Sequence, residues 1–151
     1  MAENEFYLRL ERTFDAPRDL VFQAWTDPAH LSKWWGPEYV EITHCEMDVR
    51  VGGGYRTCMA DKDGEEHWTR GDYLEIDPPS KLVFTWCWEI DGDPNNTTNV
   101  TQVAITLNET DNSKTNLVMI HSGFDTEDGR NSHNSGWTSS FDCLEQYLAS
   151  V

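Results

Sequence analysis

The stretch Ser132 to Val151, SHNSGWTSSFDCLEQYLASV, decides the fold because it has the pattern of one amphipathic helix. Its large apolar residues recur at i, i+4, i+7 and i+11, which places them on a single helical stripe: Trp137, Phe141, Leu144 and Leu148. Polar residues occupy the remaining faces. Such a stripe must be buried, so the helix needs a partner with an apolar surface.

The chain before this helix consists mainly of alternating, aromatic-rich segments that are typical of β-strands. The strongest pattern is Leu82–Glu89, in which aromatic and aliphatic residues alternate with other residues along one strand. A curved sheet with one apolar face is therefore the expected partner of the helix. We expect strands over Glu5–Phe14, Glu41–Val51, Tyr55–Ala60, His67–Asp77, Leu82–Glu89, Val100–Leu107 and Thr115–His121.

Two short helices are expected between the first and second strands. Asp15-Ala16-Pro17 ends the first strand and starts a helix that runs to about Trp25. Pro17 is expected at the first helical position. A proline at residue 28 breaks that helix. The second helix is expected from Ala29 to Trp34 or Trp35, before Gly36-Pro37. The polar segment Asp91–Asn96 is expected to be a loop, and a second polar segment, Asp125–Ser132, leads into the long helix.

This order of elements predicts an α+β fold of the helix-grip type. A curved antiparallel sheet of about seven strands would grip the long C-terminal helix, which crosses it, and the two short helices would close an open end of the sheet. The 151 residues, of 17.4 kDa, suit one hydrophobic core rather than two. We therefore expect a single domain over residues 1–151.

The charge balance excludes several classes of partner. The chain has 11 Lys and Arg and 27 Asp and Glu, so its net charge is -16 and its pI is near 4.4. This charge disfavours binding to nucleic acid and to anionic membranes. The acidic residues are dispersed, as on a solvated surface. No apolar stretch approaches the ~20 residues that span a bilayer, and the N-terminus lacks the apolar core of a signal peptide. A cytoplasmic protein without membrane insertion is expected.

The cysteines and histidines show no metal-ligand spacing. The four cysteines form no C-x-x-C pair, so free thiols are expected: Cys45, Cys58, Cys87 and Cys143. His44, Cys45 and Glu46 are consecutive on a strand, where neighbouring side chains point to opposite faces and do not form one metal site. We expect no metal and no cofactor.

Short motifs along almost the whole chain, in order, carry a resemblance to a known family. They are Phe14-Asp15-Ala16-Pro17, Val21-Phe22, Ala24-Trp25, Asp27-Pro28, Trp34-Trp35-Gly36-Pro37, Asp48-x-Arg50-x-Gly52-Gly53, Tyr55-Arg56, Asp63-Gly64, Gly71-x-Tyr73, Leu82-Val83-Phe84-Thr85-Trp86, Thr115-x-Leu117, His121-x-Gly123-Phe124, and Gly136-Trp137 with Leu144 and Leu148. Together they resemble the heat-shock-protein-90 ATPase-activator-homologue-like family, a branch of the START-like (SRPBCC, helix-grip) superfamily.

The resemblance implies more about fold than about activity. The superfamily suggests an apolar cavity between the sheet and the long helix that holds lipids, polyketides or other hydrophobic molecules. The family takes its name from a eukaryotic cochaperone in which a separate N-terminal domain contributes heavily to chaperone binding. That domain has no counterpart in this sequence, so a chaperone partner or a stress-response role follows only from the family name.

Aromatic residues are the main candidates for the wall of such a cavity, because they bind flat apolar ligands by burying area at roughly 25 cal/mol per Å². The predicted ligand-binding residues are Trp35, Tyr55, Met59, Trp68, Trp86, Trp88, Met119, His121, Trp137 and Phe141. Of these, Trp68, Trp86, Trp88 and Trp137 are expected to face inward. For Leu82, Phe84 and Leu144 we expect core packing instead.

His121 is the one candidate for a catalytic group. It shares strand parity with Leu117 and Met119, so it should point toward the long helix. It could act as a general base or bind a ligand, or it could be satisfied by a backbone carbonyl or a helix residue. We favour the second interpretation, because no catalytic partner is fixed by spacing and G-x-S-x-G is absent.

The sequence therefore predicts a protein that binds a small hydrophobic or aromatic molecule in an internal cavity. One alternative is a cyclase- or hydrolase-like enzyme that uses His121. The other is an interaction module associated with a chaperone. Since an aromatic-rich sheet edge can pair two chains, a monomer or a weak dimer is expected.

Overall fold

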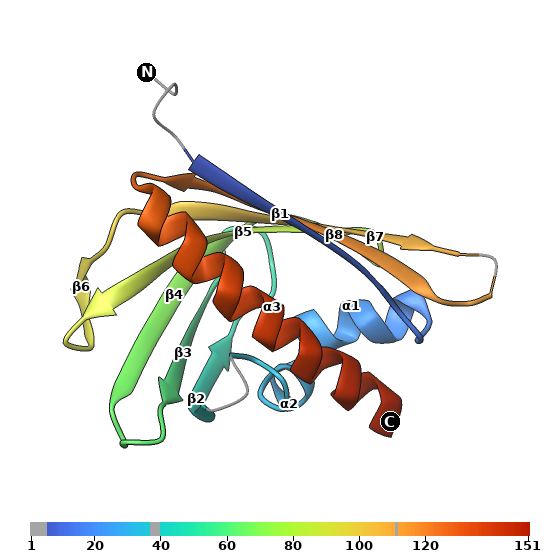
Figure 1. The fold of residues 1–151 in the computed structure, drawn as a ribbon, viewed down its shortest axis with the longest axis horizontal. Helices are drawn as coiled ribbons and strands as arrows, with labels where there is room; N and C mark the ends of the chain where they lie inside the picture. Colours follow the sequence, from blue (N-terminus) through green and yellow to red (C-terminus); the bar gives the residue numbers. More distant parts are fainter. Residues whose placement is uncertain (1–5, 37–39, 111) are drawn as a thin grey trace.

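The computed structural model describes residues 6–36, 40–110 and 112–151. A curved antiparallel sheet wraps one face of a long C-terminal helix, and two short helices lie at one end of the sheet (Figure 1). The elements are β1 (Phe6–Phe14), α1 (Arg18–Thr26), α2 (Pro28–Leu31), β2 (Glu41–Met47), β3 (Gly54–Ala60), β4 (Glu66–Asp77), β5 (Lys81–Ile90), β6 (Asp93–Thr97), β7 (Thr101–Glu109), β8 (Thr115–Phe124) and α3 (Glu127–Ser150).

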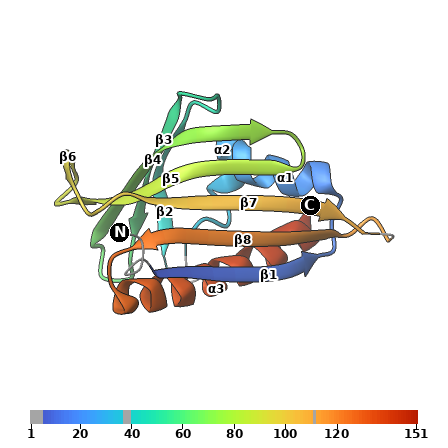
Figure 2. The same cartoon turned by 90° about the horizontal axis from the view of Figure 1, so that it is seen from above.

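The sheet has eight strands, and all its pairings are antiparallel. The main path runs β1-β8-β7-β5-β4-β3-β2, and β6 pairs with β5 outside that path. Seen from above, β1, β8, β7 and β5 lie side by side, and α3 runs beneath the β1 and β8 side of the sheet (Figure 2). The prediction of an α+β helix-grip fold is confirmed.

Two polar segments carry more regular structure than the sequence predicts. The prediction for Asp91–Asn96 is wrong in part, because Asp93 pairs with Ile90 and Thr97 with Glu89, which raises the strand count from about seven to eight. Helix α3 begins at Glu127 rather than at Ser132. The Thr126 side chain accepts a hydrogen bond from the Gly129 backbone N–H, and acidic residues in the first turn favour the helix N-terminus.

The two short helices are present, but their ends differ from the prediction. Pro17 is the N-cap of α1 and not its first helical residue. Helix α2 is only four residues long; the Asp27 side chain caps it by accepting from the Ala29 N–H, and it ends at Leu31. The predictions that involve Glu5 and Pro37 lie outside the described residues.

The apolar stripe of α3 is buried as predicted, with Trp137, Phe141, Leu144 and Leu148 each at most 4% exposed. The Phe141 ring meets Phe14 of β1 edge-on at 5.9 Å and Trp25 of α1 at 6.4 Å. Arg12 on β1 pairs with Asp142 at 2.8 Å, which adds a charged contact beside this packing. The stripe therefore fixes α3 across the sheet.

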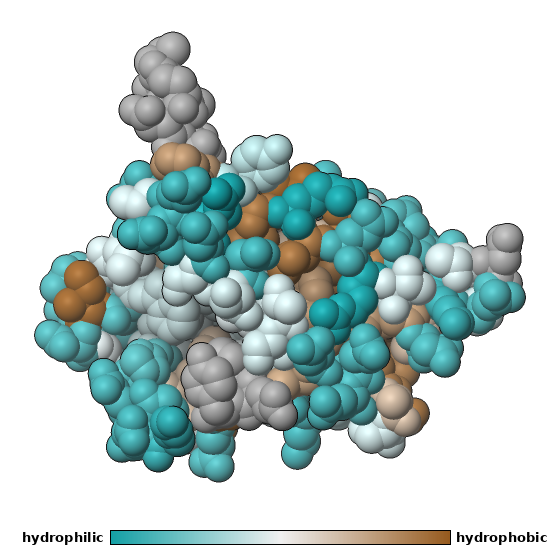
Figure 3. Space-filling model, in the orientation of Figure 1, coloured by the Kyte–Doolittle hydropathy of each residue, from teal (hydrophilic) through white to brown (hydrophobic). Residues whose placement is uncertain are grey.

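On the face seen in Figure 3, hydrophilic residues cover most of the surface, and hydrophobic residues show only between them. Of the helices among the described residues, none has the length and apolar character needed to cross a bilayer. The four cysteines, all among the described residues, form no disulfide bond with one another.

Candidate functional site: an aromatic cavity beneath the first half of helix α3

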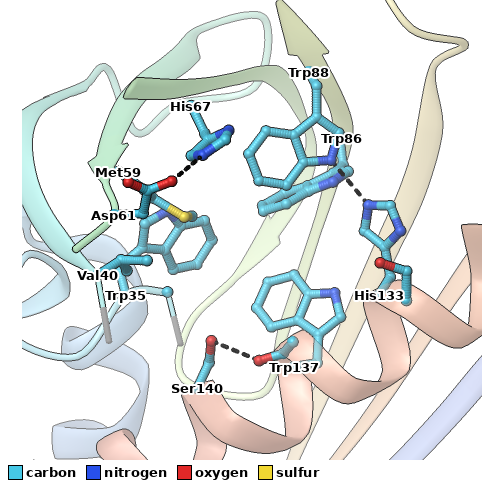
Figure 4. A pocket seen from close by; sticks show the side chains of 13 residues that line it. Trp35, Val40, Met59, Asp61, His67, Trp86, Trp88, His133, Trp137 and Ser140 are labelled. Carbon is cyan, nitrogen blue, oxygen red and sulfur yellow. Dashed lines mark hydrogen bonds and ion pairs between the residues drawn. The ribbon is translucent and has the colours of Figure 1, made fainter. Parts of the chain in front are cut away.

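A cavity of about 460 Å³ lies between the first half of α3 and strands β3, β4 and β5 (Figure 4). Indole rings surround its centre, and polar groups lie at its edges. It is lined by Trp35, Gly36, Val40, Met59, Asp61, His67, Trp86, Trp88, Ser132, His133, Gly136, Trp137 and Ser140.

Helix α3 presents small residues to this cavity. Ser132, Gly136 and Ser140 follow one another at intervals of four, so they lie on one helical face. The same i+4 series continues with Leu144 and Leu148, which are buried and do not line this cavity. A Cβ built on Gly136 would meet no atom within 4 Å, so close packing does not require glycine there. The missing side chain leaves open space.

Three indole rings form a connected wall from different elements. Trp35 follows α2, Trp86 belongs to β5 and Trp137 to α3, and their centroids lie 5.1 to 5.6 Å apart. Trp35 is held in place because its Nε1–H donates to Thr57 Oγ1 at 3.1 Å. Trp88 extends the wall at 5.5 Å from Trp86. Such a surface suits contact with flat or apolar groups.

His133 is locked as a neutral ring at one edge of the wall. Its Nε2 accepts from Trp88 Nε1–H at 2.9 Å, so its Nδ1 carries the proton that is donated to the Gly129 carbonyl at 2.7 Å. Burial lowers the pKa of His133. This contact also joins β5 to α3 across the cavity.

Asp61 and His67 occupy another edge, on the β3–β4 hairpin (Figure 4). Asp61 Oδ2 lies 3.0 Å from His67 Nε2, and Oδ1 accepts from the backbone N–H groups of Asp63 and Glu65 at 2.9 and 3.0 Å. The hydrogen bond from His67, followed by the one from Glu65, lowers the pKa of Asp61. The carboxylate is therefore ionised at neutral pH.

His121 does not line the cavity but lies behind its wall, fully buried. Its Nδ1 accepts from Trp137 Nε1–H at 3.0 Å. Its Nε2 is 2.7 Å from Thr101 Oγ1, whose own proton goes to the Trp86 carbonyl, so Nε2–H is the donor. Burial, and then the nearby His133, lower the pKa of His121 to about 3. Both nitrogens are engaged, which is the geometry of a structural histidine that holds α3 to the sheet.

Of the ten predicted ligand-binding residues, five line the cavity: Trp35, Met59, Trp86, Trp88 and Trp137. Four others are buried beside or below it in the core: Tyr55, Met119, His121 and Phe141. The Tyr55 hydroxyl, for example, donates to the Thr85 carbonyl at 2.7 Å.

Trp68 lies on the opposite face of the sheet, so the expectation that it faces inward is wrong. Side chains alternate along β4, and its neighbours His67 and Thr69 take the inner face. On the outer face, Trp68 stacks under the Arg56 guanidinium at 4.0 Å, and Arg56 makes two 2.8 Å hydrogen bonds to Glu89. The indole covers an ion pair there.

Sequence reasoning missed the polar and small lining residues. These are Gly36, Val40, Asp61, His67, Ser132, His133, Gly136 and Ser140. The small residues on α3 left a readable signal, because they precede the leucines at the same i+4 spacing. Asp61 and His67 could be identified as lining residues only once the pairing of the β3–β4 hairpin was known.

Two polar features complete the description. The Trp86 Nε1–H is buried and has no hydrogen-bond partner among the described residues. Within the described part of the chain, no three His, Cys, Asp or Glu side chains are grouped so as to hold a metal ion.

Solved structures from bacteria share this fold over nearly the whole chain. The AHSA1 protein of Silicibacter pomeroyi is 27% identical, with a TM-score of 0.84 over 95% of this chain and 98% of that one. A protein from Chromobacterium violaceum is 28% identical, with a TM-score of 0.83 over 94% and 96%. One from Nitrosomonas europaea is 26% identical, with a TM-score of 0.80 over 99% and 97%.

None of the curated proteins compared with this chain matches it significantly. The family model described as "Activator of Hsp90 ATPase homolog 1-like protein" matches residues 15–149. That match spans both short helices, β2 to β8 and nearly all of α3. The chain therefore belongs to the family of Activator of Hsp90 ATPase homolog 1-like proteins, which has the START-like helix-grip fold.

Proposed function

We propose that this protein, as a single domain, binds a small hydrophobic or aromatic molecule in the cavity beneath the first half of α3. The observation that carries the proposal is the run of small residues that α3 turns toward this space. A glycine in a helix interior costs about 1 kcal/mol relative to alanine, and at Gly136 no neighbouring atom accounts for that cost. Room for a ligand accounts for it.

The size and lining of the cavity support the same proposal. Its volume of about 460 Å³ lies within the range of ligand pockets, roughly 300–1,000 Å³. The wall is mainly indole, with few polar groups, as in pockets that bind by apolar contact. Proteins of this fold family commonly bind hydrophobic ligands, which is consistent with the geometry.

No contact among the described residues specifically favours either alternative, the enzyme that uses His121 or the chaperone-associated module. His121 is satisfied on both nitrogens and stands outside the cavity, so it lacks the access that a general base needs. A chaperone partner and a cytoplasmic location stay predictions from the sequence. So does the monomeric or weakly dimeric state.

A pair of leucine substitutions on α3 tests the proposal. Gly136→Leu would fill the cavity, because the new side chain projects into open space. Ser135→Leu is the matched control, since Ser135 is exposed and outside the lining. The neutral fluorescent probe N-phenyl-1-naphthylamine should bind the unmodified protein and the control alike.

Gly136→Leu should weaken probe binding by at least about tenfold while the protein stays folded by circular dichroism, since the same volume cannot hold both groups. Equal binding by the two variants would contradict a site in this cavity. The absence of binding by the unmodified protein, for this probe and for a small set of apolar compounds, would remove the proposal.

A further inference from the structure

We propose that the cavity selects hydrophobic molecules that carry a positively charged group, such as a protonated amine or a quaternary ammonium. This inference rests on the proposed function and specifies the ligand of the same site. Three features support it: the Asp61 carboxylate at the cavity edge, the indole wall, and the charge of the whole chain.

Asp61 is the one carboxylate among the described residues that line the cavity, and its side-chain partner there is His67, at 3.0 Å. Among the described residues that line the cavity there is no Lys or Arg. Asp61 uses one oxygen for two backbone N–H groups and the other for His67, which leaves acceptor capacity on Oδ2. A ligand cation that reaches this edge would meet a carboxylate without a Lys or Arg partner among the described residues.

The arginines near this region are engaged elsewhere. Arg56 lies on the outer face of the sheet, where it pairs with Glu89 at 2.8 Å. Arg130, in the first turns of α3, contacts Glu127 at 3.3 Å and the Tyr7 carbonyl at 3.2 Å. Neither residue lines the cavity, so neither neutralises Asp61 from within.

The indole wall favours the same class of ligand. The face of a tryptophan ring is the best of the aromatic partners for a cation within about 6 Å, and the attraction grows when the pair is shielded from water. Trp35, Trp86, Trp88 and Trp137 surround the space that faces Asp61 (Figure 4). The ring of His133 adds no positive charge there, because its Nε2 accepts from Trp88.

The net charge of -16 acts over a longer range. It raises the local concentration of cations and lowers that of anions around the whole molecule. An anionic ligand would have to overcome both this field and the nearby carboxylate. A cationic one is assisted by both.

Three ligands of one shape test the inference: 4-phenylbutylamine, 4-phenyl-1-butanol and 4-phenylbutyrate. At pH 8 the first is a cation, the second is neutral and the third is an anion. By calorimetry, the amine should bind about tenfold more tightly than the alcohol, and the acid should bind more weakly than the alcohol. Added salt should weaken the binding of the amine and leave that of the alcohol nearly unchanged.

Two asparagine variants locate the effect. Asp61→Asn should reduce the preference for the amine to about threefold, because the indole contribution remains. Asp63→Asn removes the same charge from an exposed position on the same hairpin, outside the lining, and should keep the full preference. Equal loss in both variants would assign the preference to the general field rather than to Asp61, and would contradict the role given to this residue.

The outcomes separate this inference from the proposed function. If all three ligands fail to bind, the proposed function fails with it. If the alcohol binds as tightly as the amine, the cavity is a site but the charge selection is wrong. If the acid binds most tightly, the selection is also wrong.

Discussion

The two halves of helix α3 face the same curved sheet, but the second half is closely packed against it, whereas the first half packs through Trp137 and leaves space beside its small residues. In the second half, Phe141, Leu144 and Leu148 are at most 4% exposed, and Phe141 contacts rings from β1 and α1. In the first half, Ser132 and Gly136 face a cavity of about 460 Å³, and Ser140, just past the middle of the helix, is the last residue of α3 that lines it. The backbone is regular helix throughout.

The difference lies in side-chain volume along one helical face. At intervals of four residues the face changes from Ser132, Gly136 and Ser140 to Leu144 and Leu148. The large residues supply the burial that holds the helix in place, at roughly 25 cal/mol per Å² of apolar area. The small ones leave room without moving the backbone. One end of the helix therefore anchors it, which allows the other end to cover an open space.

The largest effect is expected in the packed half. Phe141→Ala should lower the free energy of unfolding by about 3–5 kcal/mol, because it removes a ring with 1% exposure from the contact with Phe14 and Trp25. Chemical denaturation measures this. The control is Ser140→Ala in the cavity lining, which should cost less than about 1 kcal/mol. Similar losses in the two variants would contradict the division of the helix into an anchor and a cover.

The next effect concerns the polar contact behind the cavity wall. The pKa of His121 falls from its ordinary 6.5 to about 3 in the folded protein, because burial disfavours the charged ring. The unfolded chain therefore takes up the proton first. The stability from neutral His121 is fully present above pH 6.5, and it is lost as the pH falls from 6.5 toward 3.

Between pH 7 and pH 4.5, this residue should account for about 2 kcal/mol of lost stability. His121→Gln carries no titrating group, so its free energy of unfolding should fall less over the same range, although its stability at pH 7 is lower. Denaturation of both proteins at the two pH values measures the difference. Identical pH dependence would show that His121 is not held neutral by the fold.

A smaller effect is expected at the bridge across the cavity. Trp88→Phe removes the 2.9 Å hydrogen bond to His133 while keeping a ring in the wall. The expected cost is about 1 kcal/mol, in the usual range for one hydrogen bond. Hydrogen exchange should show faster opening of the α3 turns around His133, with the turns around Leu148 unchanged. Uniform change along the helix would contradict a local bridge.

The smallest effect should have the opposite sign. Gly136→Ala should raise the free energy of unfolding by about 0.5–1 kcal/mol, because alanine favours the helix and the new methyl group meets no atom within 4 Å. The melting temperature measures the gain. A loss of stability would mean that the space above Gly136 is filled, and it would contradict an open cavity at this position.

Much of the fold could be predicted from the sequence because periodicity reports it directly. The alternation in Leu82–Glu89 and the helical spacing of Trp137 to Leu148 were both confirmed. The errors fell where capping and pairing decide the structure. The first turn of α3 depends on the Thr126 cap, and the polar residues of β6 pair with Glu89 and Ile90 at the end of β5, beyond the part of β5 that pairs with β7.

The candidate site was half predicted. Indoles on inward faces, such as Trp86 and Trp137, follow from strand and helix patterns. Trp68 was misplaced, since its parity depends on the pairing of β4 with its neighbours. Asp61 and His67 carry no signal in the linear sequence as cavity residues. These two residues line the edge of the cavity because the β3–β4 hairpin places them opposite the first half of α3 (Figure 4).

The sequence by itself determined the α+β order, the amphipathic terminal helix and the acidic surface, because these depend on local spacing and composition. Only the tertiary structure decided where the interior is filled and where it is open. That outcome depends on how the volumes of side chains from several distant elements add up in one place, and no single segment contains this sum.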